Sequence, residues 1–315
     1  ETGDVDLFQY MNVVETPTDP EREISQKDAK RYGLEAELNE ELGFQIFYMP
    51  DDAAKESASL VENPTTCIID ASTAHRIDPA WSFGLPELDP AQRGRLRASK
   101  RISNPGCHAS AFILLVKPLV AGGILPAETR LAAHSITGYT GGGKKMIEQY
   151  ESAAGSLNAP RPYGLALAHK HLPEMRQHTG LSSVPIFTPI VGPFAKGLAV
   201  TVFIDPQQLK GASTPSAVRE ALAAYYAGEP FIRVMPFDNE ANTDGGFFDV
   251  EGCNDTNRVD LFVFGNAERI VLVGRLEQRL RPERCVREKE LRRAVVDPLS
   301  EALRIAVDVG LVDHE

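Results

Sequence analysis

A cysteine follows an Asn-Pro-Gly turn and precedes an apolar run, in the stretch ISNPGCHASAFILLVKPLV over residues 102–120. The apolar run predicts a helix over 108–121, so Cys107 is expected at a helix N-terminus. Backbone N–H groups and the helix dipole favour a negative charge there. A thiol in that place should have a lowered pKa and act as a nucleophile. The alternative interpretation is a small buried thiol at the start of a helix.

Two further stretches carry side chains suited to an anionic substrate and to proton transfer. DASTAHR (70–76) follows a predicted parallel strand, where α/β sheets bind ligands, and contains Ser72, Thr73 and Arg76. LAHKHLPEM (167–175) contains His169 and His171, which are candidates for a general acid/base. The alternative for DASTAHR is a polar turn with Arg76 in solvent. For LAHKHLPEM it is a solvated loop, or a metal site, although a third nearby ligand is lacking.

A glycine-rich loop, GYTGGGKK (138–145), leads into a predicted helix. Its backbone N–H groups, at Gly141 and Gly142, and the Lys144 side chain could hold a phosphate or a carboxylate. The loop lacks the spacing of a nucleotide-binding P-loop, and a flexible hairpin loop is the alternative. Lys196 in GPFAKGLAV is a further candidate for binding an anionic group.

Composition narrows the classes of partner. The chain has 315 residues, 43% of them hydrophobic, and a net charge of -11, which argues against nucleic acid and anionic membranes. Its four cysteines form no CxxC pair, so neither a metal site nor a disulfide framework is predicted. With no signal peptide and no apolar run long enough to span a bilayer, we expect a cytoplasmic protein with reduced thiols. The negative net charge does not exclude an anionic small-molecule substrate, which needs only a local basic pocket.

Two different patterns of elements divide the chain. Strand, helix and strand alternate up to TTCIID (65–70), which predicts a Rossmann-like parallel sheet with helical crossovers. After Cys107 several strands are separated by few helices, which predicts an α+β domain with a mostly antiparallel sheet. We therefore expect a dinucleotide-binding domain over 1–104, joined by a C-terminal helix at 284–315. The catalytic and oligomerisation domain would span 105–283.

Six motifs together carry a resemblance to a known family. IIDASTAHR, FGLPEL, SNPGC, GYTGGGKKMI, HKHLPEM and NDTNRVDLFVFGN occur in the order found in the short form of N-acetyl-gamma-glutamyl-phosphate reductase. That family is similar in design to aspartate-semialdehyde dehydrogenase, so the resemblance implies a semialdehyde-dehydrogenase-like fold. It also implies NADPH as cofactor, no metal, and a homo-oligomer, either a dimer or a tetramer.

The resemblance assigns roles residue by residue. Cys107 would form a thioester with N-acetyl-glutamyl 5-phosphate, and His171, or else His169, would move the proton. Arg76, Gly141, Gly142, Lys144, Glu174 and Lys196 would bind the substrate. Ser72, Thr73 and Asn104 would lie at the cofactor.

Both ends depart from the family pattern. Before Met49 the only glycines are Gly3, Gly33 and Gly43, which form no dinucleotide-binding spacing, and the segment 277–293 has no glycine. We therefore expect the parallel domain to lack its first strand and glycine-rich loop, and to bind NADPH weakly. Three alternatives stay open: a reductase like aspartate-semialdehyde dehydrogenase, a catalytically impaired homologue, and a cofactor-free thiol hydrolase.

Overall fold

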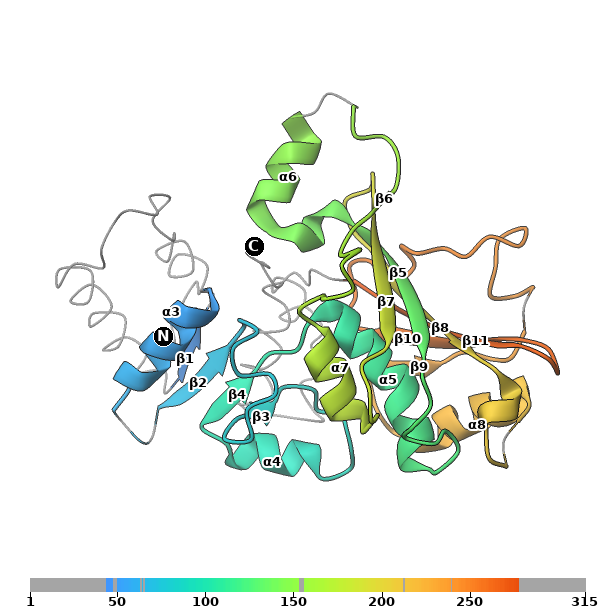
Figure 1. Cartoon of the computed structure of the whole chain (residues 1–315), viewed down its shortest axis with the longest axis horizontal. Helices are drawn as coiled ribbons and strands as arrows, with labels where there is room; N and C mark the ends of the chain where they lie inside the picture. Colours follow the sequence, from blue (N-terminus) through green and yellow to red (C-terminus); the bar gives the residue numbers. More distant parts are fainter. Residues whose placement is uncertain are drawn as a thin grey trace, which may run out of the picture.

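The computed structural model describes residues 44–47, 50–62, 64, 66–152, 156–211, 213–238 and 240–277, with the backbone alone at 44–47 and 144. Within these residues the chain forms two sheets, one parallel and one mixed (Figure 1). The predicted C-terminal helix at 284–315 and the glycines before Met49 lie outside the described residues. None of the described helices is long and apolar enough to cross a membrane.

The first sheet is parallel throughout, as the alternating strands and helices predict. Its strands follow the order β1 (Phe44–Phe47), β2 (Cys67–Asp70), β4 (Arg101–Ser103) and β3 (Ser82–Phe83). The connection from β1 to β2 contains α3 (Asp51–Leu60), and that from β3 to β4 contains α4 (Gln92–Ala98). All four residues of β2 are buried, which is typical of a parallel strand covered on both faces.

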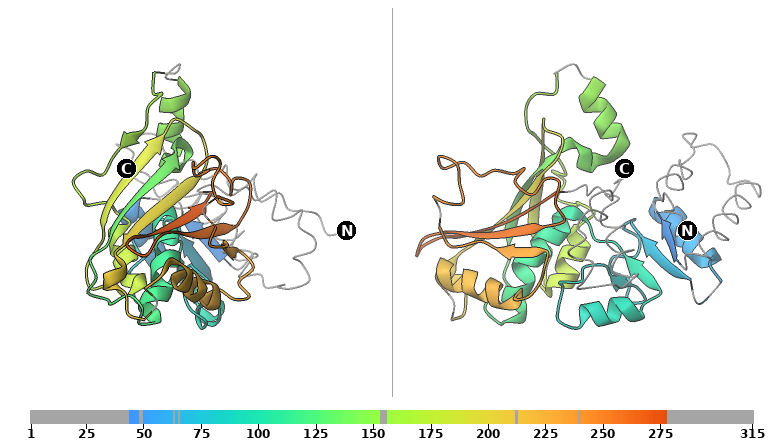
Figure 2. Two further views of the ribbon diagram at one scale, coloured as in Figure 1. Left: turned by 90° about the vertical axis from the view of Figure 1, so that its right-hand side faces the viewer. Right: turned by 180° about the vertical axis from the view of Figure 1, so that it is seen from behind.

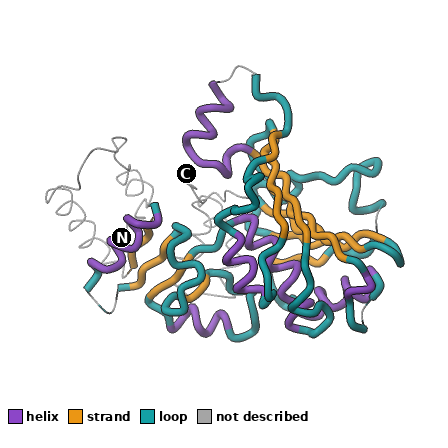
Figure 3. Tube along the Cα trace, viewed as in Figure 1, coloured by secondary structure: helices purple, strands orange, loops and turns teal. Residues whose placement is uncertain are grey.

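The second sheet has seven strands and is mostly antiparallel, which confirms the predicted change of pattern after Cys107. In order across the sheet, these are β6 (Arg161–Pro162), β7 (Ile186–Gly192), β5 (Ala132–Gly138), β8 (Leu198–Ile204), β11 (Ile270–Leu276), β10 (Val259–Gly265) and β9 (Ile232–Val234). Only the pairs β5–β7 and β9–β10 are parallel. Figure 2 shows this sheet from two further sides, and Figure 3 shows its strands as one twisted layer.

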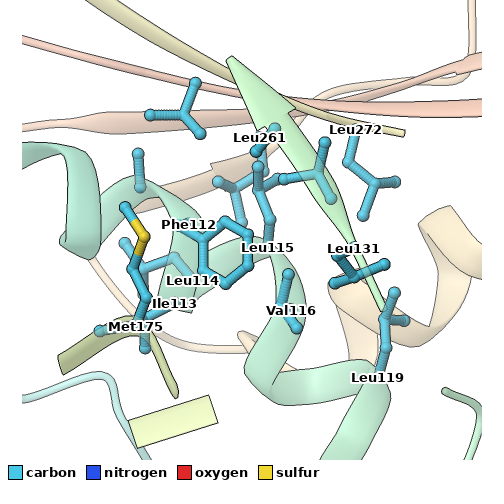
Figure 4. Close-up of a cluster of buried hydrophobic side chains, with 14 of the residues drawn as sticks. Phe112, Ile113, Leu114, Leu115, Val116, Leu119, Leu131, Met175, Leu261 and Leu272 are labelled. Atoms are coloured by element: carbon cyan, nitrogen blue, oxygen red, sulfur yellow. The ribbon is translucent and has the colours of Figure 1, made fainter. Parts of the chain in front are cut away.

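The central helix, α5 (Cys107–Ala121), joins the two sheets and carries much of the core. It contacts β8 and β11 of the large sheet, and α7 (Leu172–Thr179) and α8 (Pro215–Tyr225) pack beside it. Phe112 and Leu115 lie among side chains of the sheet, such as Leu272, in a cluster that is fully buried (Figure 4). Each such side chain contributes about 1.5–3 kcal/mol on burial, so α5 and its N-terminus are firmly held.

Candidate active site

Cys107 is the first residue of α5, as the sequence predicts, and its side chain is only 7% exposed. Gly106 precedes it in an extended conformation, with φ -75° and ψ 144°, and forms the N-cap without a capping side chain. The chain enters this turn from β4, which ends at Ser103. The nucleophile candidate therefore lies where the small sheet meets the central helix.

His171 lies directly against the backbone that precedes Cys107. A Cβ atom built on Gly106 would overlap the imidazole of His171, with Nε2 as its nearest atom. His171 is fully buried and stands at the N-cap of α7, which packs beside α5. The absence of a side chain at Gly106 thus allows the imidazole to lie against the turn that precedes Cys107. His169 lies next to it, with the two ring centroids 4.7 Å apart.

This close approach predicts a large effect for Gly106→Ala. The added methyl group would displace the His171 ring from the start of α5, and a shift of about 1 Å is enough to lower kcat by about 10²-fold. Gly94→Ala is the matched control, because a Cβ at that position of α4 meets no atom within 4 Å. Steady-state kinetics of both variants, with circular dichroism to check folding, make the comparison. Wild-type kcat in Gly106→Ala would contradict this placement of His171.

A buried ion pair fixes the turn before Cys107. Arg76, only 2% exposed, donates to Oε1 of Glu174 (2.9 Å) and to the backbone oxygens of Asn104 (2.9 Å) and Ala71 (3.2 Å). The second carboxylate oxygen of Glu174 accepts the Gly106 N–H (3.1 Å). Of the residues expected to bind substrate, the structure thus brings Arg76 and Glu174 to the nucleophile, paired with each other beneath its helix.

A third imidazole, missed in the sequence analysis, completes the cluster. His108 follows Cys107, is only 4% exposed, and has its ring centroid 5.5 Å from that of His171. Burial lowers the pKa of His108 to about 3, with His169 and Lys170 as smaller causes. Burial also holds the pKa of His171 well below its usual value, followed by the charge of Arg76. Both rings are therefore neutral near pH 7, and His171 is in the form that accepts a proton.

These pKa shifts predict a loss of stability in acid. Below pH 6.5 the unfolded chain protonates His108, whereas the folded chain does so only near pH 3. With respect to His108, the free energy of unfolding is therefore highest above pH 6.5 and falls as pH decreases towards 3, by about 1.4 kcal/mol per pH unit. Urea denaturation across this range measures the free energy of unfolding as a function of pH. The slope of that curve should be shallower for His108→Phe, by the equivalent of about one proton. An unchanged slope would contradict a neutral, buried His108.

The DASTAHR turn is organised by two carboxylates. Asp70, at the end of β2, accepts hydrogen bonds from the backbone N–H (2.9 Å) and the hydroxyl (2.7 Å) of Ser72, and also contacts Nδ1 of His75 (2.7 Å). Thr73 bonds to Asp51 of α3 through both its N–H and its hydroxyl. Ser72 and Thr73 are thus held at the carboxyl end of β2.

The carboxyl ends of β2 and β4 also fit a polar group of a cofactor or substrate. Asn104 follows β4 and is 2% exposed, and its side-chain Nδ2 has no hydrogen-bond partner among the described residues. A buried amide donor without a partner is costly, so a ligand oxygen at this place would satisfy it. Parallel α/β sheets bind their ligands at this edge. No group of three or more His, Cys, Asp or Glu in the described ranges is arranged to hold a metal ion.

The glycine-rich loop forms a short 3₁₀ turn, η1 (Tyr139–Gly142), followed by α6 (Gly143–Ser152). It packs on the 193–197 turn, where the hydroxyl of Thr140 donates to the Ala195 oxygen (2.6 Å). Close packing accounts for one of its glycines, because a Cβ at Gly142 would overlap Met146. Gly141 lies in the same turn. The side chain of Lys144 lies outside the described residues.

Lys196 lies beside this loop and is paired with acidic side chains. Its Nζ donates to Oδ1 of Asp255 (2.9 Å) and lies 3.5 Å from Oε1 of Glu277. Burial raises the pKa of Glu277, and the nearby lysine opposes that effect. An anionic substrate at Lys196 would therefore compete with two carboxylates.

Comparison with known proteins identifies relatives with a shared activity. Residues 107–277 match the family described as semialdehyde dehydrogenase, dimerisation domain. N-acetyl-gamma-glutamyl-phosphate reductase 2 of Nostoc sp. (strain PCC 7120) is 40% identical over 77% of this chain and 78% of its own length. The corresponding reductase of Chelativorans sp. (strain BNC1) is 42% identical over 71% and 72%, and that of Mesorhizobium japonicum is 36% identical over 82% of both chains.

Solved structures confirm the fold. Aspartate semialdehyde dehydrogenase II from Vibrio cholerae superposes with a TM-score of 0.58 at 16% identity, covering 75% of this chain and 74% of that one. Aspartate semialdehyde dehydrogenase from Francisella tularensis gives a TM-score of 0.59 at 11% identity, covering 84% and 81%. The predicted semialdehyde-dehydrogenase-like architecture is therefore confirmed.

Proposed function

The chain belongs to the N-acetyl-gamma-glutamyl-phosphate reductase family, and from that premise we propose that it reduces N-acetyl-glutamyl 5-phosphate to N-acetyl-glutamate 5-semialdehyde for arginine biosynthesis. The observation that carries the proposal is the position of His171 against Gly106, next to Cys107 at the start of α5. A covalent acyl transfer requires a nucleophile and a neutral base close to it, and His171 lies against the residue that precedes Cys107.

In the first half of the reaction, Cys107 attacks the acyl carbon of the acyl phosphate. His171 takes the thiol proton, the S–C bond forms, and the bond from carbon to the phosphate oxygen breaks with release of phosphate. The N-terminus of α5 stabilises the negative charge that develops beside Cys107. The product of this half is a thioester on Cys107.

In the second half, the thioester is reduced and the aldehyde leaves. NADPH, when bound, supplies the hydride, and we propose that Ser72, Thr73 and Asn104 help to hold it at the carboxyl ends of β2 and β4. His171 returns its proton to the departing sulfur of Cys107 as the aldehyde forms. The thiol and the neutral imidazole are thereby restored.

The roles of the charged residues follow from their partners. We assign Arg76 and Glu174 to positioning of the Gly106 turn, because each is buried and bonded to the other. We propose that the anionic groups of the substrate are bound by the glycine-rich loop, through Gly141, Gly142 and Lys144, and by Lys196. His169 stays the second candidate for the acid/base.

We also propose that the protein is a homo-oligomer in the cytoplasm. Ile186 and Phe203 on the large sheet are 59% and 46% exposed, on the face opposite the buried α5. Exposed apolar side chains of this size favour contact with a second copy. A charged acyl phosphate does not cross a membrane unaided, so the enzyme must work in the compartment where its substrate is made.

The reverse reaction tests this function. The full chain is given N-acetyl-glutamate 5-semialdehyde, phosphate and NADP, and formation of the reduced cofactor is followed by absorbance. We expect phosphate-dependent reduction that is lost in Cys107→Ala. If NADP were reduced with aspartate semialdehyde instead, the protein would be a reductase like aspartate-semialdehyde dehydrogenase. Similarity in fold supports that alternative. No reduction by a folded protein would leave the impaired homologue as the better description.

A further inference from the structure

His108 is the one imidazole of the cluster to which the proposed reaction assigns no role. It lies in the first turn of α5, and both of its ring nitrogens have hydroxyl partners. Nδ1 is 3.0 Å from Oγ of Ser135, which is fully buried on β5, and Nε2 is 3.1 Å from the hydroxyl of Tyr163, which follows β6. Rotation of the ring would break both bonds at once. The ring is therefore fixed from two sides by elements of the large sheet.

The fixed ring forms one wall of the space that His171 occupies. The centroids of His108 and His171 are 5.5 Å apart with the planes tilted by 50°, while His108 and His169 are 5.7 Å apart at 82°. The backbone N–H of His171 also donates to Nδ1 of His169 (3.2 Å). Gly106 lies directly against the same imidazole. Movement of His108 would leave room for the His171 ring to shift away from Gly106.

We propose that His108, clamped between Ser135 and Tyr163, is a positioning residue that holds the acid/base His171 against the turn before Cys107. The inference rests on the proposed function. It makes the 161–170 segment part of the catalytic arrangement, because Tyr163 in that segment supplies one of the two clamping bonds.

A direct role for His108 as the base is disfavoured by the same contacts. Its two nitrogens are engaged by hydroxyls, and burial, aided by His169 and Lys170, lowers its pKa to about 3. The groups that influence the pKa of His171 are Arg76, His108, His169 and Lys170, and Glu174 lies beside Arg76. Replacing Tyr163 changes none of these charged groups. Any change in the pKa of His171 or in kcat would therefore report on the position of the His108 and His171 rings.

Tyr163→Phe is the sharpest test, because it removes one hydroxyl and keeps the ring. We expect kcat about 10-fold lower with KM nearly unchanged, since a loosened base is misplaced while substrate contacts remain. Water entering beside His171 would weaken the effect of burial, so the acidic limb of the kcat/KM profile should move to higher pH. His108→Phe, which removes both bonds, should lower kcat by about 10²-fold.

Tyr225→Phe is the matched control. Its hydroxyl donates to the backbone oxygen of Leu88 (2.7 Å), away from the imidazole cluster, so kcat and the pH profile should stay at wild-type values. A thermal melt of each variant checks folding. A changed kcat with an unmoved pH profile would overturn the proposal, because it would indicate a general structural effect.

An NMR titration of ¹⁵N-labelled imidazoles gives a readout that does not depend on turnover. We expect the His171 resonances of Tyr163→Phe to shift and to titrate at higher pH than in the wild type, while those in Tyr225→Phe do not change. Unchanged His171 resonances in Tyr163→Phe would overturn the positioning role. If the wild type lacks reductase activity, the proposed function fails, and the NMR result still decides whether His108 positions His171.

Discussion

Replacing Cys107 by serine is expected to lower kcat for N-acetyl-glutamyl 5-phosphate reduction by about 10⁴-fold or more. Cys107 is the first residue of α5, and the neutral imidazole of His171 lies against the preceding residue, Gly106. A serine in that place is far harder to deprotonate than a cysteine, so its alkoxide is far less accessible than the thiolate. Loss of the thioester removes the two-step route altogether. The measurement is steady-state reduction by purified wild type and variant at equal concentration.

Cys67→Ser provides the control for that substitution. Cys67 begins β2, is only 2% exposed, and burial raises the pKa of its thiol, so it is not prepared to act as a nucleophile. We expect this variant to keep its activity. If Cys107→Ser kept its activity and Cys67→Ser lost it, Cys67 would be the nucleophile. That result would contradict the mechanism above, because Cys67 lies at the start of β2 and not at the start of α5.

Arg76→Leu is expected to destabilise the fold by about 3–5 kcal/mol, because it leaves the carboxylate of Glu174 buried without its partner. Urea denaturation measures the change. Arg95→Leu is the control, since Arg95 pairs with Asp89 at the surface and is 49% exposed. A surface pair of that kind contributes at most about 1 kcal/mol. Equal effects of the two substitutions would contradict a buried ion pair beneath the active turn.

The double variant Arg76→Leu/Glu174→Leu separates stability from catalysis. Removing both charges should recover part of the lost stability, since no uncompensated charge remains. Activity should stay low, because the Gly106 N–H loses its acceptor and the turn before Cys107 loses its support. Recovery of full activity together with stability would show that the pair acts on folding alone.

The sequence allows the main elements around Cys107 to be predicted. A continuous apolar run at TTCIID indicates a buried parallel strand, and an apolar run after Asn-Pro-Gly indicates a helix with the cysteine at its start. The strand and the helix can both be predicted because each depends on residues close together in the sequence, and residue propensity and hydrophobic periodicity describe such local patterns well. The change from a parallel to a mostly antiparallel sheet follows from the same kind of pattern.

The partners within the site could not be predicted in this way. Arg76 and Glu174 are separated by 98 residues, and His108 and Tyr163 by 55 residues. A local pattern identifies a cation or a hydroxyl but not the group that it will meet, so the buried pairing of Arg76 with Glu174 could not be predicted from it. Lys196 illustrates the same limit, because Asp255 approaches it only when the large sheet has formed. The position of His108 directly after the nucleophile was the signal that could have identified it.

The thioester itself is the most direct measure of the central claim, that Cys107 is the nucleophile of an acyl-phosphate reductase. The full chain is mixed with N-acetyl-glutamyl 5-phosphate in the absence of NADPH, quenched in acid, and digested for peptide mass spectrometry. We predict one N-acetyl-glutamyl group on the peptide that contains Cys107, with release of an equal amount of phosphate. Phosphate release with no acylated cysteine, or acylation at one of the other three cysteines instead of Cys107, would contradict the account.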